Sequence, residues 1–171
     1  MNLKQVWELI DTTDVSLFEH GNILKQYSCC DKNGADWKQY LEEHLKNHLS
    51  NHKDTITKYQ RFLLFKNDTR ALYMLYWPHH RGEQSLCKYT NMDSLTVEST
   101  PIHGHAGEGC WLKVLTGTLL ETQYFVPDKK PFAQKCLLKN NQYFISDNIA
   151  FHSIKPLQLS VSLHLYDVSN E

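Results

Sequence analysis

HGHAGEGC, residues 103–110, is the most informative stretch of this sequence. Side chains at positions i and i+2 of a β-strand point to the same face, so His103 and His105 would present two imidazoles side by side. Imidazole is a frequent ligand of transition metals, and two of them on a rigid strand can bind one ion. The stretch therefore predicts a metal site built on a β-sheet.

The spacing around these histidines extends the pattern. Four residues separate His105 from Cys110, and six separate Cys110 from Gly117. A third histidine, His152, ends a segment that is typical of a strand, a turn and a second strand. The spacing resembles the signature of the cupin barrels, with Cys110 at the position where that signature has an acidic residue. Glu108 lies two positions away from that slot.

The length and composition indicate one globular domain. The chain has 171 residues, and 41% of them are hydrophobic, which is enough for a full core. The formal net charge of −1 provides no basic surface for nucleic acid or for an anionic membrane. We therefore expect a monomer that binds neither nucleic acid nor membrane.

The N-terminal stretch and the cysteines point to a cytoplasmic protein. The first residues are mixed polar and lack the apolar centre of a signal peptide, and no stretch has transmembrane length. The chain has five cysteines without a CxxC pair, which indicates reduced thiols rather than a disulfide framework or a zinc site.

Two kinds of periodicity divide the chain into a helical part, residues 1–56, and a strand-rich part, residues 57–171. In the first part, two apolar stripes recur at helical spacing, over 3–10 and 37–49. In the second part, short β-rich runs alternate with turn residues. These runs lie at 59–65, 71–77, 111–115, 119–126, 133–138, 142–146 and 159–166. The pattern predicts a mainly β single domain, a cupin jelly-roll β-barrel with an N-terminal helical extension.

The last of these runs has two different faces. Its leucines and valine share one face, and the other carries Ser160, Ser162, His164 and Tyr166. A polar strand face is most often exposed to solvent. A barrel interior that binds a metal also needs polar side chains, and the strand alone does not separate the two interpretations.

Several segments together resemble cysteine dioxygenase, and they occur in a consistent order over residues 59–166. The segments are Tyr59-Gln60-Arg61, Trp77, His103-Gly104-His105 with Cys110, the run 112–122 (LKVLTGTLLET), His152 and Ser162-Leu163-His164-Leu165-Tyr166. Each segment is a weak signal, whereas the ordered set is a specific match. The resemblance implies an Fe(II)-dependent enzyme that oxidises L-cysteine with O2 to cysteine sulfinic acid.

Three histidines hold the iron in that family, and the resemblance assigns this role to His103, His105 and His152. Three neutral imidazoles on Fe(II) leave positions open for a bidentate small-molecule thiol and O2. The substrate thiolate then brings the negative charge that a carboxylate ligand brings in other oxygenases. The competing interpretation, unrelated core or surface histidines, is weakened by the cupin spacing.

The resemblance also implies a binding site for the substrate carboxylate. Arg61 matches the family arginine that binds it, and a guanidinium offers permanent charge and a planar fork of donors. An arginine is ordinarily a solvated surface residue, but the apolar residues after Arg61 favour a strand inside the domain. Tyr59 would add a hydroxyl close to the same carboxylate.

Cys110 and Tyr166 match the pair that forms a thioether crosslink in the family, in a step that depends on iron and O2. This protein-derived cofactor leaves the tyrosine hydroxyl near the iron, and His164 would orient that hydroxyl. The commonest fate of a free cysteine is to be a small buried hydrophobe. The position of Cys110 in the cupin spacing favours the functional interpretation.

Two other features have simpler interpretations. His44, His48 and His52 recur every fourth residue of a predicted helix, but the charged residues between them indicate a partly solvated helix face rather than a metal site. The vicinal Cys29 and Cys30 are interpreted as loop thiols.

The chain departs from the family at several points, which bear on the choice of substrate. The segment 78–99 contains an insertion, the helix near 41–52 looks inserted, and the Ser-Pro step that follows the family tyrosine is absent after Tyr166. A related dioxygenase for 3-mercaptopropionate or cysteamine is one alternative. Cys110 disfavours the 3-mercaptopropionate branch, which usually lacks a cysteine there. A cupin that binds a metal or small molecule without turnover is the other.

Overall fold

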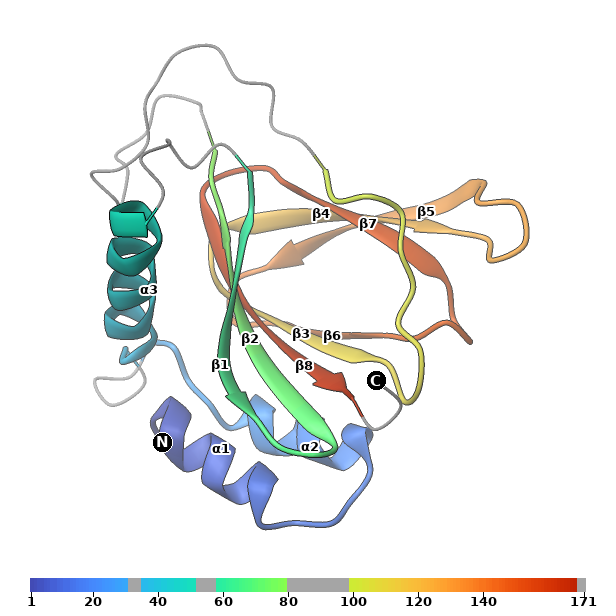
Figure 1. The fold of residues 1–171 in the computed structure, drawn as a ribbon. Coiled ribbons are helices and arrows are strands. Elements are labelled where there is room, and N and C mark those ends of the chain that lie inside the picture. Colours follow the sequence, from blue (N-terminus) through green and yellow to red (C-terminus); the bar gives the residue numbers. More distant parts are fainter. Residues whose placement is uncertain (31–34, 52–57, 80–98, 169–171) are drawn as a thin grey trace.

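The computed structural model describes residues 1–30, 35–51, 58–79 and 99–168 (Figure 1). Within these ranges, the helices are α1 (Leu3–Asp11), α2 (Leu17–Lys25) and α3 (Trp37–Asn51). The strands are β1 (Gln60–Lys66), β2 (Arg70–Trp77), β3 (Cys110–Thr116), β4 (Thr118–Tyr124), β5 (Pro131–Leu138), β6 (Gln142–Ile145), β7 (Phe151–Pro156) and β8 (Ser160–Asp167). None of the described helices is long and apolar enough to cross a lipid bilayer.

The strands form two antiparallel sheets that face each other. The larger sheet has the order β1-β2-β8-β3-β6, and the smaller one has the order β5-β4-β7. From β3 onward the chain passes from one sheet to the other four times, between β3 and β4, β5 and β6, β6 and β7, and β7 and β8, as it does in a jelly roll. The helices lie on the outer side of the larger sheet (Figure 1). The expected jelly-roll barrel with an N-terminal helical extension is therefore confirmed.

The helical part divides differently from the two predicted stripes. The first stripe is α1 and the second is α3, and α2 lies between them as a separate helix. A capping box starts α2, because the Ser16 side chain accepts from the Glu19 amide while the Glu19 carboxylate accepts from the Ser16 amide. The Ser-x-x-Glu spacing is thus a sequence signal for the N-terminus of α2. The apolar periodicity alone did not distinguish α2 from the helices on either side of it.

Strand β8 is buried on both faces, which decides between the two interpretations of its alternation. Leu163 and Leu165 are 0% exposed and pack in the core that the helices form with the larger sheet. On the opposite face, Ser162 is 0% exposed and His164 is 4% exposed. The polar face of β8 is therefore turned into the barrel and not to solvent.

The histidines of α3 lie outside the barrel. The His44 ring stacks on Phe62 of β1, with 5.1 Å between the ring centroids, and burial lowers the pKa of His44. His48 is half-buried. His52 and residues 80–98 of the predicted insertion at 78–99 lie outside the described residues. Part of the predicted solvated face of α3 is therefore a packing contact with the larger sheet.

Candidate metal centre

Three histidine side chains meet inside the barrel, although they come from segments far apart in the sequence. The backbones of His103 and His152 form an isolated bridge, with N–H to O distances of 3.0 and 2.9 Å. His152 lies on β7. His103 and His105 were predicted to lie on a β-strand, but they lie on an extended segment before β3 that is not a regular strand. Their ligand nitrogens all lie within 4.8 Å of one another.

The glycine between the first two histidines is closely packed by neighbouring side chains. A Cβ at Gly104 would overlap with Asp147 Oδ1, and the ring of Phe151 is also close. The same Asp147 oxygen accepts a hydrogen bond from the His105 amide at 2.5 Å. Asp147, which the sequence did not single out, therefore fixes the backbone of the His-Gly-His segment.

Burial favours the neutral form of His103 and His105, which is the form that binds a metal. Desolvation lowers the pKa of His103 and lowers the pKa of His105 to about 3, and the neighbouring histidines add to the shift of His105. The group contains three imidazoles and no carboxylate. Neutral nitrogens gathered in this way fit a divalent transition-metal ion that keeps positions open for other ligands.

Glu121 holds His152 from the side opposite the cavity, and the sequence analysis missed it. His152 Nδ1 lies 2.7 Å from Glu121 Oε1, while His152 Nε2 lies 2.9 Å from His105 Nε2. Burial opposes ionisation of Glu121, but hydrogen bonds from His152 and Lys135 outweigh it and lower its pKa. An ionised Glu121 places the His152 proton on Nδ1 and leaves Nε2 free for a metal.

The alternation of β4 contained a signal for this residue. Leu119 and Glu121 are two positions apart on one strand face, and Leu119 is 0% exposed. A carboxylate on a buried face needs a partner. The identity of the partner depended on the pairing of β4 with β7, which brings two segments together across the fold.

Replacing Glu121 with glutamine is expected to weaken metal binding about 10- to 100-fold, because the His152 ring loses its charged acceptor. Titration against a competing chelator measures this change. Glu42→Gln is the matched control, since Glu42 is an exposed residue of α3 that pairs with Lys46. Equal metal affinity in the Glu121 variant and the control would contradict the role.

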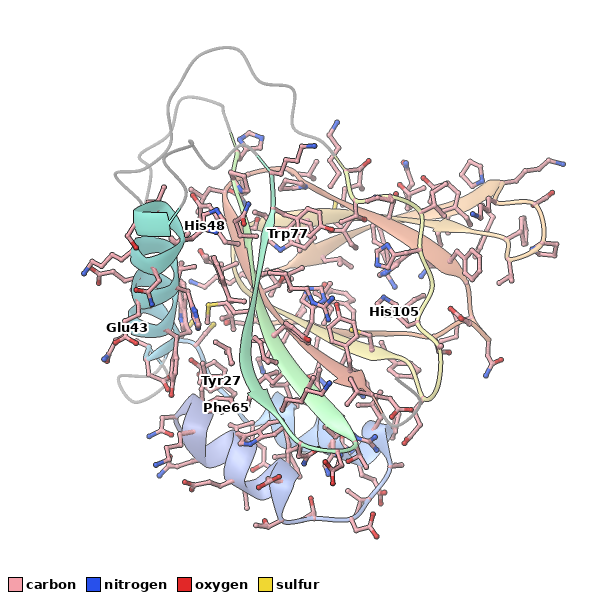
Figure 2. All side chains as sticks on the ribbon, viewed as in Figure 1. Tyr27, Glu43, His48, Phe65, Trp77 and His105 are labelled. Atoms are coloured by element: carbon pink, nitrogen blue, oxygen red, sulfur yellow. The ribbon has the colours of Figure 1, made fainter. Side chains whose placement is uncertain are left out.

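The histidines open into a cavity of about 390 Å³. Every site residue predicted from the sequence lines it except Cys110. The predicted residues in its lining are Tyr59, Arg61, His103, His105, His152, His164 and Tyr166. Trp77 and His105 lie in the space between the two sheets, at different heights (Figure 2).

Cys110 and Tyr166 are direct neighbours across β3 and β8. Their Cα atoms are register partners, and the tyrosine packs against the small buried cluster that contains Cys110. Burial raises the pKa of both the Cys110 thiol and the Tyr166 phenol. The structure therefore brings the predicted crosslink pair together, and the covalent bond remains a prediction.

A chain of hydrogen bonds links Tyr166 to the barrel interior. The Tyr166 hydroxyl lies 3.3 Å from His164 Nδ1, and His164 Nε2 lies 2.9 Å from Ser162 Oγ. The indole of Trp77 donates to the same Ser162 oxygen at 2.8 Å. Burial holds the pKa of His164 well below its usual value, so the ring is neutral. His164 is thus placed to orient the Tyr166 hydroxyl.

Arg61 lies at the edge of the cavity and is more exposed than predicted, because β1 is the edge strand of the larger sheet. Its guanidinium lies over the ring of Tyr73, 3.7 Å from the centroid, and 4.9 Å from that of Tyr166. No carboxylate of the described residues pairs with it.

Tyr59 stacks on Trp77, with 5.1 Å between the centroids. No sequence motif marked Tyr73, whose contacts arise only from strand pairing.

The fold and the site define a cupin-type barrel with three histidines that could hold one metal ion. The chain is similar to cysteine dioxygenase type 1 of Danio rerio, with 24% identity over 174 residues, which cover 96% of this chain and 71% of that protein. It is also similar to cysteine dioxygenase type 1 of Homo sapiens, with 37% identity over 73 residues, which cover 38% of this chain and 36% of that protein. No protein-family model matches the chain. The resemblance to cysteine dioxygenase is therefore confirmed by the comparison of sequences.

Solved structures give looser matches. A Bacillus halodurans protein has a TM-score of 0.47 at 10% identity and covers 74% of this chain and 80% of its own. A cupin superfamily protein from Desulfitobacterium hafniense has a TM-score of 0.42 at 12% identity and covers 65% of this chain and 78% of its own. The fold class therefore rests on the strand order of the chain itself.

Proposed function

We propose that the protein is a thiol dioxygenase that oxidises L-cysteine with O2 to cysteine sulfinic acid at an Fe(II) ion held by His103, His105 and His152. One observation supports this most: a single cavity brings together three histidine side chains, the Arg61 guanidinium and Tyr166, and the buried Cys110 is the register partner of Tyr166. When bound, Fe(II) would supply a redox-active centre where a thiolate and O2 react together.

The side chains of this chain favour an anionic substrate. Neutral imidazoles leave the charge of a divalent ion uncompensated, which favours a thiolate over a neutral ligand. Arg61 would bind the substrate carboxylate through two parallel N–H to O hydrogen bonds. Because its pKa is raised, Tyr166 stays protonated and can donate its hydroxyl proton to a bound molecule. Both atoms of O2 pass to the sulfur, so R–S⁻ and O2 give R–SO2⁻ without an external reductant.

Oxygen uptake by the iron-loaded protein tests the proposal, with L-cysteine, 3-mercaptopropionate and cysteamine as separate substrates. We expect the highest kcat/KM with L-cysteine and one sulfinic acid formed per O2 consumed. A preference for either other thiol would reassign the substrate within the class. No O2 consumption with any thiol, despite bound iron, would instead support the cupin that binds without turnover.

Aerobic turnover with cysteine is expected to join Cys110 to Tyr166 covalently. Formation of the sulfur–ring bond removes one hydrogen from each residue, and O2 is the oxidant. The intact mass should therefore fall by about 2 Da, as it does for a disulfide. Treatment with a reductant restores the mass of a disulfide but not of a thioether.

Two cysteine variants separate the crosslink from other oxidation. Cys110→Ala should lose the reductant-resistant species while keeping bound iron and part of the activity, because the sulfur is not a ligand. Cys136→Ala is the matched control, since Cys136 is an exposed free thiol of β5. A reductant-resistant loss of mass that persists in Cys110→Ala would refute the assignment.

A further inference from the structure

Arg70, the first residue of β2, is a buried cation that the proposed reaction does not use. Its side chain is 4% exposed, yet all five of its N–H donors have acceptors at 3.2 Å or less. The acceptors are His20 Nδ1, the carbonyls of Val15 and Thr69, Asp167 Oδ1 and Glu108 Oε1. Such a set of partners fixes the guanidinium in one orientation.

Two of these partners reach the segment between His105 and Cys110, residues 106–109, which we call the site loop. Glu108 belongs to the site loop, and its amide donates to Asp167 Oδ2 at 2.8 Å. Gly107 has a φ of +65°, and a Cβ there would overlap with the same carboxylate oxygen. The site loop therefore fits closely against Asp167, whose carboxylate Arg70 holds from the other side.

The other partners belong to the start of helix α2. Glu108 Oε2 accepts from the amide of Leu17, the first residue of α2, at 2.6 Å. Arg70 donates to the carbonyl of Val15 and to the ring of His20, just before and within that helix. Arg70 and Glu108, which form a salt bridge with each other, thus connect the start of α2 to the site loop through three hydrogen bonds.

We propose that Arg70 is a positioning residue that holds the site loop in place through Glu108 and Asp167 and couples it to α2. The site loop connects His105, a candidate metal ligand, to Cys110, the cysteine of the predicted crosslink. Asp167 directly follows Tyr166, the other residue of that crosslink. Asp167 also stands where the Ser-Pro step of the family would begin. Its carboxylate makes the salt bridge to Arg70 that a serine could not make.

The chemistry of the network makes Arg70 hard to replace. The Asp167 side chain is 3% exposed, so loss of the cation leaves a buried carboxylate without its charged partner. Lysine keeps the charge but offers three donors from one nitrogen, where the network uses five donors on three nitrogens. Release of the site loop is the expected response, because Glu108 can move into solvent while Asp167 cannot.

Hydrogen exchange of the full-length protein tests the proposal and needs no turnover. In Arg70→Met, the amides of Glu108 and Leu17 should exchange at least about ten-fold faster, since both lose the anchor of their acceptor. Lys113→Met is the matched control. Lys113 is also a buried cation bound to α2, but it donates to the carbonyls of Leu24 and Lys25 at the far end of that helix. It should leave both amides protected.

If Arg70→Met does not fold, a second variant tests whether the contact between Arg70 and Glu108 holds the site loop. Glu108→Ala removes a side chain that is 43% exposed, so folding should tolerate it, and the amide at position 108 should again exchange faster. Unchanged protection of this amide in whichever variant folds would overturn the proposal.

A kinetic consequence rests on the proposed function. In Arg70→Met, kcat for cysteine should fall about 10- to 100-fold with little change in KM, and the Cys110–Tyr166 bond should form more slowly. Lys113→Met should change neither. If no thiol consumes O2, the proposed function fails, while the exchange result still decides the role of Arg70.

Discussion

Replacing His152 with alanine is expected to abolish metal binding and thiol oxidation together. The substitution removes one of three candidate ligands and leaves two imidazoles, both on the extended segment before β3. The loss of metal affinity should exceed the roughly 100-fold that loss of a ligand's hydrogen-bond partner costs. Elemental analysis of the purified protein measures the iron, and oxygen uptake with cysteine measures the activity.

A histidine outside the barrel provides the control for this variant. His48→Ala removes a half-buried imidazole from α3, which contributes no side chain to the cavity. It should keep its iron and its activity. Thermal unfolding of both variants shows whether they fold, because His152→Ala also removes one partner of the buried Glu121. Full iron occupancy and activity in His152→Ala would show that the three-histidine assignment is wrong.

Replacing Arg61 with alanine is expected to raise the KM for cysteine far more than the KM for cysteamine. Cysteine has a carboxylate for the guanidinium to bind, and cysteamine has none. Loss of one partner from a charged pair at a binding site costs about 2–5 kcal/mol. Because Arg61 is exposed at the cavity edge, we expect a cost of about 2 kcal/mol, which corresponds to about a 30-fold rise in KM.

The comparison of two substrates is the internal control for Arg61. A general disturbance of the cavity would raise both Michaelis constants, whereas loss of a carboxylate partner raises only one. Arg61→Lys should give an intermediate value for cysteine, since it keeps the charge and loses the planar fork. Equal effects of Arg61→Ala on the two substrates would argue against carboxylate binding.

The sequence was most informative where the chemistry is local. The His-x-His spacing brought two imidazoles together even though His103 and His105 do not lie on a regular strand, because an extended segment keeps the same two-residue period. The alternation of β8 separated its two faces correctly. The alternation could not show which face of β8 points into the barrel, because the helices that cover the apolar face precede β8 by more than a hundred residues.

The parts that sequence reasoning missed depend on contacts between distant segments. Glu121 and His152 are separated by 31 positions, and Arg70 and Asp167 by 97. No periodicity within one strand predicts such partners, since they follow from the pairing of strands and the docking of helices. Helix α2 was the exception, because its capping box is a local signal that was present and not used.

The burial of β8 on both faces has a consequence for how this barrel assembles. A slip of one residue in the pairing of a strand moves every side chain to the opposite face. In β8, such a slip would place His164 among apolar side chains of the helices and Leu163 in the cavity. Both faces would then lose favourable contacts, whereas a strand with one solvated face would lose them on one side only. The N-terminal helices therefore help to select the correct strand register during folding, and with it the side chains that line the cavity.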